Sequence, residues 1–203
     1  MAMLIFGELG AEIFSSRISL IFLIFGLTIL FAGWRHMRAA LFPWAFLFFM
    51  IPVPALVLNQ VTIPLQLLAS KLAAGALPLF GVPVLREGNV INLPAMPLEV
   101  AEACSGIRSL IALTALAVMY GQLTERSRSI RLMLALAAIP IAICANSLRI
   151  IGTGLLVQYW APEAARGFFH SFSGWLIFLV SLGMLFCLHR LLVQAKTGAQ
   201  HGT

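Results

Sequence analysis

Residues 130–157 read IRLMLALAAIPIAICANSLRIIGTGLLV, a stretch in which the only charged side chains are those of Arg131 and Arg149. A helix needs about 20 mostly apolar residues to cross the hydrocarbon core of a bilayer. The stretch is longer than that, and its apolar composition indicates that lipid surrounds it. It therefore predicts a membrane-spanning helix that carries one arginine, Arg149, inside its apolar part.

The rest of the chain has the same character. It contains 203 residues, of which 61% are hydrophobic and 10% charged, and its mean hydropathy is +1.01. A soluble domain carries about 25% charged residues, so this chain has too little polar surface to cover a globule in water. We predict an all-α polytopic membrane protein, with residues 1–203 forming a single integral membrane domain and residues 197–203 a mobile tail. A disordered chain and a nucleic-acid-binding module are excluded.

Including residues 130–157, we expect about five membrane crossings. The other four lie at residues 18–34, 39–58 and 171–193, and from near Cys104 to residue 120. Residues 59–80 are also apolar, but Pro64 and Pro78 interrupt them, which favours a re-entrant or interfacial helix. Residues 81–103 contain a Gly-Asn turn between short extended runs. This pattern predicts a small hairpin that caps the extracytoplasmic helix ends.

Positively charged loops set the expected orientation, because Lys and Arg collect on the cytoplasmic side. They cluster in the turns after the first and third predicted spans and in the tail after the last one, at Arg35, Arg38, Arg126, Arg128, Arg131, Arg190 and Lys196. If these face the cytoplasm, the N-terminus lies outside. The loop at residues 159–169 then also lies outside the cell membrane.

Arg149 is the first candidate site residue, because ionisable side chains inside a span are costly and often functional. It follows Arg131 by 18 residues, or about 27 Å of helix, which places it near the outer edge of the bilayer core. Asn146 lies three residues before it and shares its helix face. The alternative is an arginine that extends outward to lipid headgroups.

Cys104 is the second candidate, and it opens a predicted helix in the sequence Glu102-Ala103-Cys104-Ser105-Gly106-Ile107-Arg108. A helix N-terminus and a nearby arginine both stabilise a thiolate, and Arg108 follows Cys104 at the i+4 position. The alternative is a small buried hydrophobic residue, which is our interpretation of the mid-span Cys144 and Cys187. Three scattered cysteines do not make a disulfide framework or a zinc site.

His170 is the third candidate and stands at the outer end of the last predicted span; alone it fits an interfacial histidine as well. Together the three residues bring a thiol, a guanidinium and an imidazole to one outer plane from three helices. Cysteine needs a base to become a nucleophile, and histidine is the usual one. The acidic residues are all Glu, so a Ser-His-Asp triad and an Asp-rich metal site are excluded, and we expect no metal and no cofactor.

Several blocks of the sequence resemble the exosortase/archaeosortase family of membrane-embedded cysteine transpeptidases, in its bacterial exosortase branch. The strongest are EACSGIRSL at residues 102–110, NSLR at 146–149 and HSFSGW at 170–175. Weaker matches lie upstream, at Pro52-Val53-Pro54, Pro64-Leu65-Gln66, residues 81–84 and residues 87–91. The resemblance covers about residues 40–190, and it places the family's catalytic Cys, Arg and His on Cys104, Arg149 and His170.

The resemblance implies cleavage of exported proteins at a C-terminal PEP-CTERM sorting signal, through a cysteine thioester, in the inner membrane of a bacterium with the site on its periplasmic face. It also implies a link to exopolysaccharide and biofilm assembly. The expected partners are such proteins and lipid, with no nucleic acid.

Supporting roles are expected for Arg108, Asn146, Glu102 and Ser105, with Arg108 pairing with Glu102 or meeting an acidic substrate residue. The sequence leaves transpeptidation and hydrolysis open. It also leaves a non-catalytic component of polysaccharide export and a transporter as rival functions.

Overall fold

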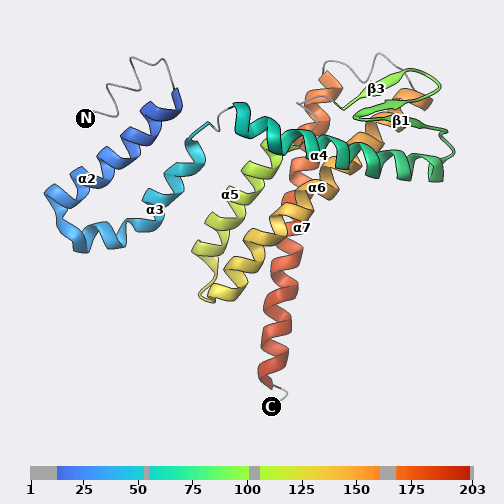
Figure 1. The fold of residues 1–203 in the computed structure, drawn as a ribbon. Helices are drawn as coiled ribbons and strands as arrows, with labels where there is room; N and C mark the ends of the chain where they lie inside the picture. Colours follow the sequence, from blue (N-terminus) through green and yellow to red (C-terminus); the bar gives the residue numbers. More distant parts are fainter. Residues whose placement is uncertain (1–12, 53–54, 101–105, 161–167, 202–203) are drawn as a thin grey trace. The chain divides into compact units, whose positions relative to one another are not determined.

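The computed structural model of the chain describes residues 13–52, 55–100, 106–160 and 168–201, and these residues are mostly helical (Figure 1). Five helices are long and apolar enough to cross a membrane: Phe14–Ala39, Leu58–Phe80, Ile107–Thr124, Arg128–Tyr159 and Phe172–Lys196. Many of their large apolar side chains are exposed, among them Phe31 at 83%. Such exposed apolar surfaces are expected where lipid surrounds the helices. The prediction of an all-α polytopic membrane protein is therefore confirmed.

The chain divides into two compact units, residues 1–59 and 60–203, and each is described by itself. In the first unit, helix α2 (Ile13–Ala39) bends at Gly33, whose backbone has a φ of 79°. A short helix α3 (Leu41–Phe46) and a 3-10 turn η1 (Leu47–Met50) follow. Trp44 of α3 donates a hydrogen bond from its indole nitrogen to the carbonyl of Ile21 at 3.0 Å, which fastens α3 back onto α2.

The prediction of one continuous span over residues 39–58 is wrong. The helical stretch Leu41–Met50 is only ten residues long, and it ends at Ile51, whose backbone is extended with φ −79° and ψ 123°. Ile51 precedes Pro52, and the proline ring disfavours helical backbone in the residue before it. The helix therefore stops at that point, and a new one begins at Ala55.

Helix α4 (Ala55–Ala76) corrects a second expectation. Pro64 lies inside this helix and does not break it, because a membrane helix tolerates the loss of one backbone N–H when neighbours compensate. Pro78 lies in the following 3-10 turn η2 (Leu77–Phe80). The apolar stretch Leu58–Phe80 has the length to cross a membrane, and its re-entrant or interfacial placement stays a prediction.

Three helices form the centre of the second unit: α5 (Ile107–Thr124), α6 (Arg128–Tyr159) and α7 (Phe168–His201). Helix α6 packs against both of the others, and α4 runs obliquely across them in Figure 1. Fully buried side chains such as Leu113, Leu134 and Leu185 form the core between the three. Helix α7 continues to His201, so residues 197–201 of the predicted mobile tail are helical.

A three-stranded antiparallel sheet follows η2, in the order β1 (Leu85–Glu87), β2 (Val90–Asn92) and β3 (Pro97–Glu99). Gly88 has a φ of 63°, a left-handed backbone that glycine adopts readily and that a tight hairpin turn requires. The predicted hairpin with its Gly-Asn turn is confirmed. The third strand, β3, was not predicted from the sequence.

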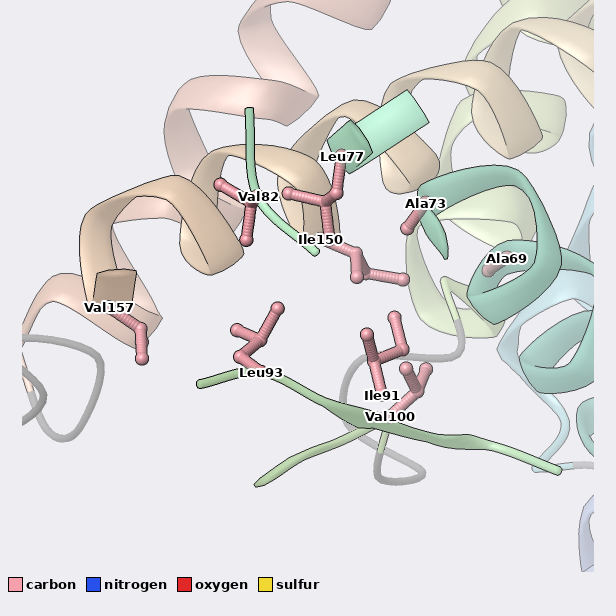
Figure 2. Packing of buried hydrophobic residues seen from close by; sticks show 9 residues of the cluster. All are labelled: Ala69, Ala73, Leu77, Val82, Ile91, Leu93, Val100, Ile150 and Val157. Carbon is pink, nitrogen blue, oxygen red and sulfur yellow. The ribbon is translucent and has the colours of Figure 1, made fainter. Parts of the chain in front are cut away.

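The sheet packs against α4 and α6, and the side chains on its buried face meet theirs in one cluster (Figure 2). Ile91 and Val100 point from the sheet toward Ala69 and Ala73 of α4 and Ile150 of α6. All of these side chains are nearly or fully buried. The sheet therefore has one apolar face in the protein core and one face that remains outside it.

Near the C-terminal end of α5, a network of hydrogen bonds between polar groups joins this helix to the C-terminal half of α7. The His189 ring contacts the Tyr120 hydroxyl at 2.8 Å through Nδ1 and a Glu125 carboxylate oxygen at 2.7 Å through Nε2. Arg131 donates to the Glu125 carbonyl at 2.6 Å. This network lies 19 residues beyond His170 along α7, or about 28 Å, so His189 cannot reach the candidate site.

Candidate active site

The segment that carries Cys104 leads into α5 through Gly106. Gly106 is the N-cap of α5 and has a left-handed backbone, with φ 77° and ψ 0°. Helix α5 therefore begins at Ile107 and not, as the sequence predicted, near Cys104. Cys104, Ser105 and Glu102 lie outside the described residues.

Gly106 rests directly on Asn146 of α6. A Cβ atom at Gly106 would lie 2.8 Å from Asn146 Cγ and 3.0 Å from its Cβ, closer than real side chains pack. Asn146 is itself buried, with 5% of its surface exposed. The glycine of the Cys-Ser-Gly sequence is thus needed twice, for its left-handed backbone and for its close approach to α6.

Replacing Gly106 with Ala is expected to destabilise the protein and impair its activity. The left-handed backbone alone costs an alanine about 1–2 kcal/mol, and the clash with Asn146 adds to that cost. Thermal unfolding in detergent measures the effect. Gly183→Ala is the matched control, because a Cβ there meets nothing within 4 Å and alanine favours helix. Equal melting temperatures for the two variants would contradict the packing described for Gly106.

Arg149 reaches from α6 to the first turns of α7. Its Nε donates to the Ser173 hydroxyl at 3.3 Å. A Cβ atom at Gly174 would lie 3.5 Å from the guanidinium carbon, which is an ordinary van der Waals distance, so the guanidinium packs directly against this turn of α7. His170 precedes these two residues by three and four positions, and its backbone therefore lies on the same face of α7, one turn earlier.

One turn of α6 thus joins two elements that are far apart in sequence. Asn146 contacts Gly106, the N-cap of α5, which follows Cys104 by two positions. Arg149 contacts Ser173, which follows His170 by three positions on α7. The two α6 residues are three positions apart, which is about 4.5 Å along the helix axis. The start of α5 and the start of α7 are consequently held at one level of the molecule, both against α6.

Helix α4 also lies next to Gly106 and Asn146. A cavity of about 10 Å³ lies beside Gly106 and Asn146, and α4 contributes two of its walls, Leu65 and Ala69. That volume is close to the minimum for one water molecule. The packing around Gly106 is therefore tight, and this cavity is far too small for a peptide.

The structure thus brings together Arg149, Asn146 and the backbone of His170, whereas the His170 side chain lies outside the described part of the chain. Arg108 is exposed in the first turn of α5. Gly106, Ser173 and Gly174 were not expected to have roles. All three stand within the quoted sequence blocks, but only the packing against α6 shows that Gly106 must lack a side chain and that Ser173 accepts a hydrogen bond from Arg149.

Cys144 and Cys187 are free and exposed on α6 and α7, so they are not the small buried residues that we expected. In a helix that crosses a membrane, an exposed side chain faces lipid or a neighbouring element. Neither cysteine belongs to the contacts around Asn146 and Arg149.

A comparison with family models matches residues 1–187 to the transmembrane exosortase model. The match includes every candidate site residue and extends further toward the N-terminus than the resemblance seen in the sequence. No curated protein and no solved structure was found to match the chain.

Proposed function

Since the chain belongs to the transmembrane exosortase family, a family of membrane sorting transpeptidases, we propose that it cleaves sorting signals with Cys104 as the nucleophile. The observation that carries the proposal is the α6 turn that contacts both the cap after Cys104, through Asn146, and the turn after His170, through Arg149. A thiol, a guanidinium and an imidazole are the groups that the proposed thioester chemistry requires.

The substrate class follows from the sequence resemblance. The substrates are exported proteins with a C-terminal PEP-CTERM signal, which consists of a Pro-Glu-Pro motif, a transmembrane helix and basic residues. Such a signal presents its cleavable bond at the membrane surface. The enzyme then lies in the inner membrane with its site on the periplasmic side, and its products serve exopolysaccharide and biofilm assembly.

In the first step, the Cys104 thiol gives its proton to the His170 imidazole and the sulfur attacks the peptide carbonyl carbon. Histidine suits this role because its unperturbed pKa lies close to neutral pH. The carbonyl oxygen takes up the negative charge, and Arg149 stabilises it with a charge-assisted hydrogen bond. The partial positive charge at the N-terminus of α5 acts in the same direction.

In the second step, the tetrahedral intermediate collapses to a thioester and the C–N bond breaks. The imidazolium of His170 gives its proton to the departing amine. An amine or hydroxyl of an acceptor molecule then attacks the thioester, transfers its proton to His170 and regenerates the thiol. With such an acceptor the enzyme is a transpeptidase, and with water it is a protease.

The assay for this function is reconstitution of the purified protein in liposomes with a reporter protein that ends in a PEP-CTERM signal. We expect the reporter to be shortened at its signal and, when hydroxylamine is added, to be released as a hydroxamate by attack on the thioester. A non-catalytic component of polysaccharide export would leave the reporter intact. An uncut reporter under conditions where the protein remains folded would contradict the proposal.

A further inference from the structure

The outer edge of strand β3 carries backbone groups that the sheet does not use. Val100 donates its N–H to the Asn89 carbonyl, and Leu93 donates to the Met96 carbonyl. In an antiparallel ladder, hydrogen-bonded residue pairs alternate with pairs that are not hydrogen-bonded. The bonded pair that lies between these two is therefore Ile91 and Leu98. The N–H and C=O of Glu99, and the C=O of Pro97, therefore point away from β2.

The presence of Pro97 agrees with this alternation. Proline has no N–H, and it is tolerated in a strand only where that N–H would not be part of the ladder. Both Pro97 and Glu99 are exposed, and in the part of the chain that the structure describes no other strand pairs with β3 on this side. The edge is short but open.

The same edge leads directly to the nucleophile. Cys104 follows Glu99 by five positions, a length of chain that spans at most about 17 Å. Strand β3 is also fixed in place, because Val100 is fully buried under α4 and α6. A peptide lying along β3 would therefore follow a rigid edge toward the segment that carries Cys104.

We propose that the protein substrate binds as an added strand on the outer edge of β3, with its backbone paired to Glu99 and Pro97. This inference rests on the proposed function, and it assigns a substrate-binding element to it. Strand addition supplies affinity through main-chain hydrogen bonds. An extended peptide held in this way exposes its carbonyl groups in a defined register, as attack by a thiolate requires.

The register of the sheet also sets a preference for the substrate side chain beside Glu99. Glu87, Val90 and Glu99 are paired across the three strands, so their side chains share one face of the sheet. That face is opposite to the one on which Ile91 is buried. Like charges directly across a strand pair are destabilising, so the substrate residue paired with Glu99 is neutral or basic.

The test compares two substitutions at one position, using the reconstituted full-length protein and the PEP-CTERM reporter. Glu99→Ala removes the carboxylate and keeps the N–H, whereas Glu99→Pro also removes the N–H that points outward. The β2–β3 ladder does not use that N–H, and Leu98 is already extended, as a residue before proline prefers. We expect kcat/KM of Glu99→Pro to be at least about tenfold below that of Glu99→Ala.

A second measurement leaves the enzyme unchanged and so does not depend on how the variants fold. Single N-methyl groups are moved along a synthetic peptide that contains the PEP-CTERM signal and its flanking residues. Strand addition requires alternate N–H groups of the peptide, so inhibition of cleavage should recur with a period of two residues.

Equal activity of the two Glu99 variants together with the absence of a two-residue period would overturn the strand proposal. The proposed function would survive that result if Cys104→Ala still abolished cleavage. If the Cys104→Ala protein cleaved the reporter, the proposed function itself would fail.

Discussion

Replacing Cys104 with Ala abolishes cleavage of the reporter if this residue supplies the attacking sulfur. In enzymes that use a serine or cysteine nucleophile, its removal lowers kcat by roughly 10⁴-fold or more. Cys104→Ser is also expected to fail, because a serine hydroxyl is ionised far less readily than a thiol near neutral pH. Reporter cleavage by the purified, reconstituted variants measures both effects.

Cys187→Ala serves as the control for this prediction, since Cys187 is exposed in the middle of α7 and remote from the contacts around Arg149. We expect it to retain wild-type cleavage. Full cleavage by the Cys104→Ala protein would remove the nucleophile from the mechanism and favour the rival function, a membrane component that binds glycans or lipids through its arginines.

Replacing Arg149 with Ala is expected to lower kcat/KM by about 10²-fold or more, which is the effect of losing one oxyanion donor. Part of the loss comes from the contact with Ser173, because the guanidinium also holds the first turns of α7. Arg149→Lys keeps the charge but not the fork of N–H donors. We expect this variant to recover only part of the activity.

Ser173→Ala separates the two roles of Arg149. It removes the hydrogen-bond acceptor for Nε and leaves the guanidinium in place, so a role of Arg149 that acts only through this hydrogen bond would make the two alanine variants equally defective. We expect Ser173→Ala to lose much less activity than Arg149→Ala. Equal losses in kcat would show that Arg149 acts only through its hydrogen bond to Ser173 and would contradict its role as oxyanion donor.

The sequence predicted the parts of the fold that composition controls. Apolar length located four of the five candidate spans, and Arg149 was conspicuous because charge is rare in such segments. The Gly88-Asn89 turn was predictable because few residues accept its backbone. These signals are local, and each can be read without knowing what lies next to it.

The errors arise where neighbours decide the structure. Ile51 looks like a helix residue until the effect of Pro52 on its backbone is considered. Pro64 looks like a helix breaker, but α4 continues through it, as helices in membrane proteins can. The contact of Gly106 with Asn146 joins residues 40 positions apart, and no periodicity in the sequence encodes it.

The central claim is that Cys104 and His170 meet beside Arg149, and a disulfide trap tests it most directly. His170→Cys is introduced into a protein in which Cys144 and Cys187 have been replaced by Ala, so that Cys104 is the only other thiol. A disulfide forms only when the two Cα atoms lie within about 7 Å. Phe172→Cys is the control, because it points about 200° away around α7.

After mild oxidation, we expect an intramolecular disulfide in nearly all of the His170→Cys protein and in little of the Phe172→Cys protein, as measured by mass spectrometry of the linked peptides. If the cysteine at position 170 stays reduced, or links no faster than the one at position 172, Cys104 and His170 do not share a site and the account is contradicted.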